Sequence, residues 1–370
     1  MGRKMLVWAP PPSAGHRTGR MTRPGGRVPQ LLCALLLCAL LPGCLGDSRP
    51  VEGTTFAMGT VMSFTLYGGW DREKTKEARD WMLGRLGWLD SLLSVTNEYS
   101  DIAQINCAEG RGVKVEPSTA QLLSQALELC RVTEGALDVT AYPAVKAWGF
   151  TGEEHRVPSA AELEELAQRI DYAAVKLEED RVTLPEGMEI DLGGVAKGYA
   201  GDVLGATVRA NGISSALLDL GQSTIVAVGT KPGGKPWRIG VVDPARPGDY
   251  FAVVELADMA MGTSGGYQRY FEQDGVTYWH ILDPDTAAPA RSGLSSVTVV
   301  APSALACDGL STALFVMGLE EGTAFWRDHP ELDFEAIFVT EDGKIYRTAG
   351  LEGSFSLAEG YEDREVTVLE

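Results

Sequence analysis

The feature that most constrains the fold of this chain is a series of short strand-like segments that follow one another with only brief turns between them. The segments alternate polar and apolar residues, and turn residues such as those at 232–234 separate them. They cover residues 54–67, 174–184, 216–228, 237–242, 251–256, 277–282 and 295–300. Strands joined by short turns pair mainly antiparallel, and helical segments lie between groups of them. The sequence therefore predicts an α+β fold with mostly antiparallel sheets and helices packed between the lobes.

Three segments carry apolar residues at helical spacing. Residues 71–93 and 117–132 form the first two. The third, at 159–169, begins with Ser159 and Glu162 in the spacing of a capping box, in which the serine accepts a hydrogen bond from the backbone of the glutamate. With 45% hydrophobic residues, the chain can form one large core or two lobes.

The first 43 residues indicate a secretion signal rather than part of the fold. Residues 1–27 contain six basic and no acidic residues, and a mostly apolar run of about 14 residues follows at 28–41. This run is shorter than the roughly 20 residues that a membrane-spanning helix needs. It leads into Leu-Pro-Gly-Cys at 41–44, which resembles a bacterial lipobox and implies cleavage before Cys44 and acylation of its thiol. Cleavage nearby without lipid attachment is the alternative.

These boundaries divide the chain into a signal peptide (1–43), a tether (44–53) and a folded domain (54–370). A lipid anchor would hold the domain at the membrane in the cell envelope, on the outer face of the cytoplasmic membrane or in the periplasm. Removing six of the 32 basic residues leaves 26 against 51 acidic ones, a formal charge of −25. Such a surface repels phosphate backbones, so the charge argues against nucleic acid as a partner.

Three cysteines remain beyond Cys44, namely Cys107, Cys130 and Cys307. Their odd number and their spacing match neither a disulfide framework nor a zinc site. At most one bridge can form, and buried free thiols are the favoured interpretation.

Two segments combine residues suited to a phosphate ligand and a divalent metal. The run Asp-Leu-Gly-Gly-Val-Ala-Lys at 191–197 follows a strand-like segment and opens a helix, whose free N–H groups and Lys197 favour an anion. A tight turn before a helix gives the same pattern without a ligand. Asp308 and Thr312 stand four residues apart on one face of a helix predicted to run to Met317. Their oxygens suit Mg²⁺, although a helix cap followed by a core threonine is the plainer explanation.

A third segment, at 278–283, contains His280 followed closely by Asp283. Imidazole exchanges a proton near neutral pH, so His280 is a candidate general acid or base. A lone histidine in a strand is more often structural, and the spacing alone favours that interpretation.

Taken together, these segments resemble the ApbE family, magnesium-dependent enzymes that move FMN from FAD onto a threonine of another protein. The resemblance covers nearly the whole chain after the signal, in family order. Its main motifs lie at 58–60, 138–140, 191–198, 263–265, 280–284 and 308–312. It implies an ApbE-like fold and an FAD:protein FMN transferase that releases AMP. The implied partners are FAD, as the FMN donor, and a threonine-bearing exported or membrane redox protein, as the acceptor.

The resemblance also implies roles for individual residues. The ligands of Mg²⁺ are the Gly194 carbonyl, Asp308 and Thr312. The residues that contact FAD are Met58, Asp138, Lys197 and a loop containing Ser264 and Gly265. His280 helps to activate the acceptor hydroxyl or the leaving AMP.

Among the departures from the family pattern, Gln222 and Ala287 stand where the family has glycine. If the turns need a positive φ, the backbone is strained there. Two other functions stay open. One is an FAD pyrophosphatase, in which water replaces the threonine, and the other is a flavin-binding lipoprotein without catalysis.

Overall fold

The computed structural model describes residues 49–68, 71–152 and 154–370. The predicted signal peptide, Cys44 and the tether up to Ser48 lie outside the described residues, so export and lipid attachment stay predictions. Within the described ranges, no helix is both long and apolar enough to cross a bilayer.

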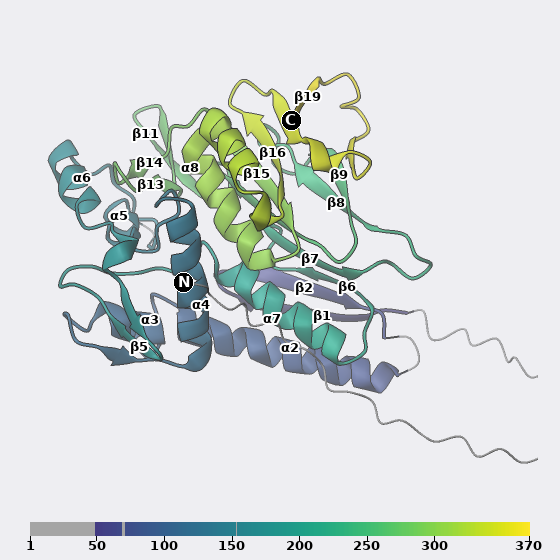
Figure 1. The fold of residues 1–370 in the computed structure, drawn as a ribbon, viewed down its shortest axis with the longest axis horizontal. Helices are drawn as coiled ribbons and strands as arrows, with labels where there is room; N and C mark the ends of the chain where they lie inside the picture. The colour runs from purple at the N-terminus through teal and green to yellow at the C-terminus, as the bar shows by residue number, and fades with distance from the viewer. Residues whose placement is uncertain (1–48, 69–70, 153) are drawn as a thin grey trace, which may run out of the picture. The chain divides into compact units, whose positions relative to one another are not determined.

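The centre of the described fold is a nine-stranded sheet in the order β1-β2-β6-β7-β10-β15-β16-β17-β19 (Figure 1). Neighbouring strands are antiparallel except for β17 and β19, which are parallel. The strands are β1 Val51–Ala57, β2 Thr60–Leu66, β6 Ser215–Asp219, β7 Thr224–Gly229, β10 Ala260–Gly265, β15 Leu294–Ala301, β16 Glu335–Thr340, β17 Ile345–Thr348 and β19 Val366–Leu369.

Smaller sheets surround this centre. The sheet β18-β9-β8 consists of Phe355–Leu357, Tyr250–Leu256 and Trp237–Val242, and the sheet β3-β5-β4 consists of Val113–Lys114, Arg181–Thr183 and Lys176–Glu178. Two hairpins stand apart from them, β11 Tyr270–Gln273 with β12 Val276–Trp279 and β13 Leu282–Asp283 with β14 Ala288–Pro289. The α-helices are α2 Arg72–Leu93, α3 Asp101–Asn106, α4 Pro117–Val132, α5 Tyr142–Ala147, α6 Ala160–Ala167, α7 Ala196–Ala210 and α8 Ala304–Asp328. Short 3₁₀ turns lie at η1 Tyr172–Ala174, η2 Pro330–Leu332 and η3 Ala349–Leu351.

The central strands of the main sheet, β7, β10, β15 and β16, are buried on both faces. Helices α2, α7 and α8 contact one face, where inward side chains such as Phe64, Leu218 and Val299 join the larger core. The sheet β18-β9-β8 covers the other face, where Phe251 packs in the same cluster as Met261. Burial of alternate residues on both faces supplies the main driving force for this layering. The predicted α+β class with mostly antiparallel sheets is confirmed.

The predicted helices form with the expected boundaries. Asp71 caps α2 by accepting a hydrogen bond from the Lys74 backbone, and α4 covers the predicted span 117–132. At α6, the Ser159 side chain accepts from the backbone N–H of Glu162 at 3.3 Å, which is one half of a capping box, whereas the Glu162 carboxylate pairs with Arg156.

The segment predicted as one strand at 54–67 is instead the hairpin β1–β2. Met58 and Gly59 form its turn with φ values of 49° and 74°, because a two-residue hairpin turn that matches strand twist has positive φ at both positions. The strand also starts earlier than predicted. Val51 is buried in the core, so the last three residues of the predicted tether belong to the sheet.

Several strands are absent from the sequence prediction, including β10, β16, β17 and β19. Strand β10 is buried along most of its length between β7 and β15, so it lacks the polar and apolar alternation that reveals a strand. Ser264 and Gly265 therefore lie in a central strand, and their prediction as a loop is wrong.

Helix α8 carries a break that agrees with the predicted helix end at Met317. Gly318 has a φ of 83°, which interrupts the helix before its second half. Cys130 and Cys307 are buried free thiols as expected, whereas the thiol of Cys107 is free but exposed. Cys107 follows α3 as its C-cap, at a position where the chain reaches the surface.

Candidate active site

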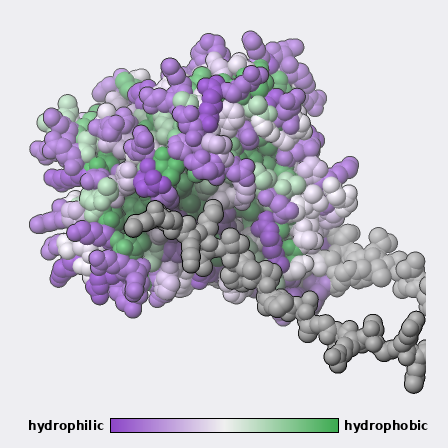
Figure 2. All heavy atoms as spheres, viewed as in Figure 1, coloured by the Kyte–Doolittle hydropathy of each residue, from purple (hydrophilic) through white to green (hydrophobic). Residues whose placement is uncertain are grey.

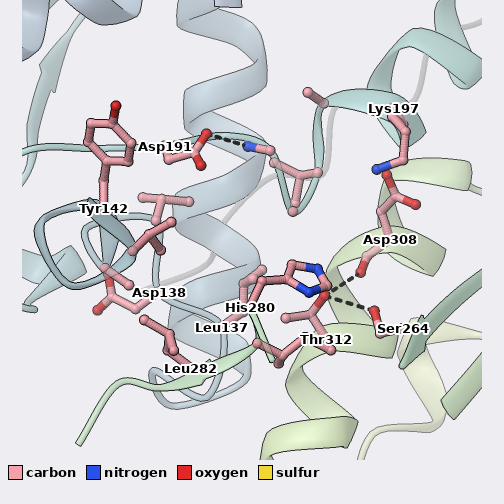
Figure 3. A pocket seen from close by; sticks show the side chains of 18 of the residues that line it. Leu137, Asp138, Tyr142, Asp191, Lys197, Ser264, His280, Leu282, Asp308 and Thr312 are labelled. Carbon is pink, nitrogen blue, oxygen red and sulfur yellow. Dashed lines mark hydrogen bonds between the residues drawn. The ribbon is translucent and has the colours of Figure 1, made fainter. Parts of the chain in front are cut away.

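A cavity of about 290 Å³ brings most of the predicted site residues together. Figure 2 shows a mostly hydrophilic rim with hydrophobic residues where this face is hollowed, and Figure 3 shows the side chains that line the cavity. The predicted residues among its lining are Met58, Asp138, Gly194, Lys197, Ser264, His280, Asp308 and Thr312. Gly265 is not part of the lining. It is buried, and a Cβ added to it would lie 2.5 Å from the Tyr267 ring.

Asp308 is a buried carboxylate with both oxygens held by the protein. Its Oδ2 accepts a hydrogen bond from the Gly198 backbone at 2.7 Å, and its Oδ1 accepts from the Thr224 hydroxyl at 2.5 Å. Burial, at 6% exposure, raises the pKa of Asp308, whereas the positive charge of Lys197 opposes this effect. The carboxylate is thus oriented by α7 and β7, although it belongs to α8.

The close crossing of α7 and α8 places Asp308 against Gly198. A Cβ at Gly198 would lie 2.2 Å from the Ala304 carbonyl oxygen, so only glycine permits the contact. Asp202, one turn further along α7, caps the start of α8. Its carboxylate accepts hydrogen bonds from the Ser303 hydroxyl at 2.8 Å and from the backbones of Ala304 and Leu305 at 2.7 and 3.1 Å.

Thr312 belongs to a cluster of hydroxyl groups next to Asp308 (Figure 3). Its Oγ1 lies 3.0 Å from the Ser264 Oγ and 3.3 Å from the Asp308 carbonyl oxygen, to which it donates. Ser264 also lies 2.8 Å from Ser311 Oγ. Because α8 and the central strand β10 supply these groups, their oxygens sit at fixed positions beside the carboxylate.

The start of α7 opens toward the cavity. Val195 is its N-cap residue and offers no side-chain hydrogen bond. The Ala196 N–H donates to the Leu192 carbonyl and the Gly198 N–H to Asp308, so the Lys197 N–H is the one in this turn without a partner among the described residues. Gly193 and Gly194 precede it in an exposed turn, in which the Gly193 backbone donates to Asp191 at 2.8 Å. Lys197 lies in the first turn and makes no ion pair or hydrogen bond with the described residues. The free Lys197 N–H at a helix start, together with the ammonium of the same residue, favours an anion.

His280 lies in a bend between β12 and β13, not within a strand as predicted. Its backbone N–H and its Nδ1 both lie 3.1 Å from the carbonyl oxygen of Arg269. A carbonyl only accepts, so Nδ1 carries the proton and Nε2 is the basic nitrogen of the neutral ring. Burial and the positive charges of Arg269 and Lys197 lower the pKa of His280 to about 4. The ring is therefore neutral near pH 7.

Asp138 faces the cavity but is also engaged with the backbone around it. Its Oδ1 accepts from the Thr140 N–H at 2.8 Å and from the Thr140 hydroxyl at 2.6 Å, and its Oδ2 accepts from the Tyr172 N–H at 2.9 Å. Burial raises its pKa, and these hydrogen bonds counteract the rise. Met58 lies in the β1–β2 turn, and its backbone N–H donates a hydrogen bond of 3.0 Å to the Asp90 carboxylate.

Three residues with clear roles at the cavity are absent from the sequence prediction: Asp202, Thr224 and Arg269. Asp202 falls within the glycine-rich motif, yet its capping role depends on residues about a hundred positions away. Thr224 lies in a segment whose pattern predicts only a strand, and Arg269 lies in a segment without a distinctive pattern. Within the described residues, no three His, Cys, Asp or Glu side chains gather to hold a metal, so a metal here would rest on one carboxylate.

Lys197 and Arg269 both line this cavity and make no ion pair with the described residues, so the cavity is suited to receive an anionic ligand. Together with a neutral imidazole and a buried carboxylate, they define an enzyme that acts on a phosphate-bearing substrate.

The comparisons with known proteins agree with this class. The sequence matches the ApbE family over residues 58–338. The FAD:protein FMN transferase of Treponema pallidum (strain Nichols) is 32% identical over 345 residues, which cover 88% of this chain and 94% of that protein. The ApbE protein of Thermotoga maritima has a crystal structure similar to this one, with a TM-score of 0.76 and 34% identity over 83% of this chain and 99% of that chain. The flavin transferase ApbE of Vibrio cholerae gives a TM-score of 0.72 at 30% identity, over 82% and 98% of the two chains.

This chain therefore belongs to the ApbE family. The predicted resemblance is confirmed, and so are the ApbE-like fold and the expected enzyme class, FAD:protein FMN transferase. The roles of the individual residues stay predictions.

Proposed function

We propose that this chain transfers FMN from FAD to a threonine hydroxyl of a target protein in a Mg²⁺-dependent reaction that releases AMP. The names of its relatives support flavin transfer from FAD to a protein. The observation that carries the finer proposal is the buried carboxylate of Asp308, which Gly198 and Thr224 orient beside the start of α7.

The residues around Asp308 fit a magnesium ion. Each carboxylate oxygen accepts one hydrogen bond from the protein and keeps a further lone pair for a metal. Asp308, Thr312 and the Gly194 carbonyl would be the protein ligands, because Mg²⁺ takes few protein oxygens and completes its shell with phosphate and water. When bound, Mg²⁺ would neutralise charge on the diphosphate of FAD.

The remaining residues bind the donor and handle the proton. Lys197, through its ammonium and its backbone N–H, would hold the diphosphate, while Met58, Asp138 and Ser264 would surround the donor site. The threonine oxygen forms a bond to the phosphorus of the FMN half, and the bond from that phosphorus to the bridging oxygen breaks. AMP leaves with the bridging oxygen, and the hydroxyl proton passes to Nε2 of His280.

A direct test is to incubate the purified soluble domain with FAD, Mg²⁺ and the envelope fraction of a bacterial host. Transfer predicts a fluorescent flavin that stays on a protein band after denaturation, and mass spectrometry should place FMN on a threonine. Release of FMN and AMP at the same rate with and without the envelope fraction would instead support FAD hydrolysis. Binding of FAD with neither outcome would support a flavin carrier.

We also propose that the chain is exported and held at the membrane through a lipid on Cys44, near an exported or membrane redox protein that serves as acceptor. The basic, apolar and Gly-Cys sequence of residues 1–44 supports this proposal. Expression with an alkyne-tagged fatty acid should label the wild-type chain and not the Cys44→Ala variant. Equal labelling of both chains would remove the lipid anchor from the proposal.

A further inference from the structure

The hairpin β11–β12 carries a cation to the cavity that has no role in the reaction as proposed so far. Arg269 immediately precedes β11, and His280 immediately follows β12. The carbonyl oxygen of Arg269 accepts hydrogen bonds from both the backbone N–H and Nδ1 of His280, each at 3.1 Å. The two residues therefore close the base of the hairpin and hold a fixed position relative to each other.

The guanidinium group of Arg269 is exposed and lines the cavity. It makes no hydrogen bond or ion pair with the part of the chain that the structure describes. Its positive charge lowers the pKa of His280 and opposes the rise in the pKa of Asp191 that burial causes, so it acts on both of these cavity residues. An unpaired arginine in a cavity of so acidic a protein is available to an anionic ligand.

Aromatic contacts fix the hairpin itself. Tyr278 packs on Trp148 and on Phe271, with ring centroids 5.2 Å apart in both pairs, and His155 stacks on Phe271 at 4.8 Å. The guanidinium of Arg291 lies 4.1 Å from the ring centroid of Trp279, which belongs to β12. The base of the hairpin is thus held before any ligand binds, which lowers the cost of reorganisation during catalysis.

We propose that Arg269 is a catalytic residue that donates hydrogen bonds to the non-bridging oxygens of the phosphoryl group being transferred, while His280 takes the hydroxyl proton. This inference rests on the proposed function. As the threonine oxygen bonds to phosphorus and AMP departs with the bridging oxygen, charge is redistributed over the phosphoryl oxygens and the leaving group. A planar guanidinium offers paired donors to two such oxygens, which a lysine ammonium does not.

The test compares Arg269→Gln, Arg269→Lys and the control Arg291→Gln at saturating Mg²⁺ over a range of FAD concentrations. We expect Arg269→Gln to lower kcat by about a hundredfold with a smaller change in KM, as for other donors to transition-state oxygens. Arg269→Lys should recover only part of the rate. Arg269→Gln should also move the acidic limb of kcat/KM to higher pH, because a cation next to His280 is lost. A merely structural role would not move this limb, and Arg291→Gln should leave it in place.

Two results would overturn the inference. One is a kcat of Arg269→Gln within threefold of the wild type. The other is a loss of kcat in Arg291→Gln as large as in Arg269→Gln, which would show that the effect arises from hairpin packing. Calorimetric titration with magnesium pyrophosphate gives an independent readout. Arg269→Gln should bind it about tenfold more weakly than the wild type, and unchanged affinity contradicts the inference. If the wild type binds pyrophosphate through Arg269 but neither cleaves FAD nor labels a protein, the proposed function fails and the anion site stands.

Discussion

The two walls of the cavity are built in different ways. The sheet-and-helix wall consists of Ser264, Asp308 and Thr312, which belong to β10 and α8, and Gly198 of α7 and Thr224 of β7 support it by holding Asp308. The loop wall consists of Met58, Asp138, Arg269 and His280, which lie in turns, in a bend or beside short strands. The polar groups of the first wall are paired mainly with one another, whereas those of the second are tied to nearby backbone.

This difference separates two tasks. On the sheet-and-helix wall, the proposed metal ligands need fixed spacing, and central strands and packed helices provide it. On the loop wall, His280 is oriented through Nδ1 while Nε2 stays available, and Arg269 is anchored through its carbonyl while its guanidinium stays available. We expect substitutions on the first wall to affect the metal requirement, and substitutions on the second to affect the proton and phosphoryl steps.

The largest effect is expected at Asp308. Asp308→Asn keeps the size of the side chain but removes the charge that would bind Mg²⁺, so the rate of FAD cleavage should fall by at least about a hundredfold. The measurement is the initial rate over a range of Mg²⁺ concentrations. Asp258→Asn, in an exposed turn where the carboxylate pairs with Arg209, serves as the control. If the Asp308→Asn variant cleaved FAD at a rate within tenfold of the wild type at saturating Mg²⁺, the proposed metal role of Asp308 would be contradicted.

The pH dependence probes the loop wall. A base with a pKa of about 4 stays deprotonated down to that pH, so kcat/KM should remain level between pH 8 and 5 and fall tenfold per unit below about 4. An unperturbed histidine would already lose about tenfold near pH 5.5. The profile should be measured with FAD well below KM, where it reports the free enzyme. An acidic limb centred near 6.5 would show that the cavity does not lower the pKa of this imidazole.

Thr224 tests whether the sheet-and-helix wall acts through the orientation of Asp308. Thr224→Val removes the hydroxyl that donates to Oδ1 at 2.5 Å, and Thr224→Ser retains it. We expect the valine variant to need about tenfold more Mg²⁺ for half-maximal rate, because loss of a hydrogen bond to a charged group costs about 1.5–3 kcal/mol. The serine variant should stay near wild type. Equal behaviour of the two variants would point to packing instead.

Asp202 tests the crossing of α7 and α8. Asp202→Ala removes three hydrogen bonds at the start of α8, and loss of a helix cap costs about 0.5–2 kcal/mol. The expected result is a free energy of unfolding that is lower by about this amount, together with a modest rise in the Mg²⁺ requirement. Denaturant unfolding measures the first quantity. An unchanged Mg²⁺ requirement in a destabilised variant would limit Asp202 to a role in stability.

The smallest effect is expected at the two positions where the family has glycine. Gln222 and Ala287 have φ values of 66° and 55°, in the left-handed region, so the strain expected from the sequence has its structural basis. Gln222 is exposed, and Gln222→Gly should stabilise the fold by roughly 0.5 kcal/mol after the entropy cost of glycine. Ala287→Gly should gain less, because its buried methyl group is lost. Destabilisation by Gln222→Gly in thermal unfolding would contradict this account.

The sequence indicated part of the cavity and not the rest, for a physical reason. The pair Asp308 and Thr312 is readable because residues four apart share a helical face. The roles of Thr224 and Asp202 depend on partners 84 and 101 residues away, and no local pattern encodes such pairings. Strand β10 escaped detection because burial on both faces removes alternation. The hairpin turn at Met58 escaped detection because its first residue is not glycine.

The break in α8 at Gly318 affects how this chain can vary. In an unbroken helix, one inserted residue rotates everything beyond it by about 100°. Here the Ser292 hydroxyl donates to the Phe315 carbonyl beside the break, and Gly318 leaves helical geometry. An insertion in residues 319–328 therefore does not rotate Asp308 and Thr312 about the helix axis relative to the cavity. Strands β17, β18 and β19 lie beyond the span that matches the family, and the chain can diverge in length there while the ligand-bearing turn keeps its orientation.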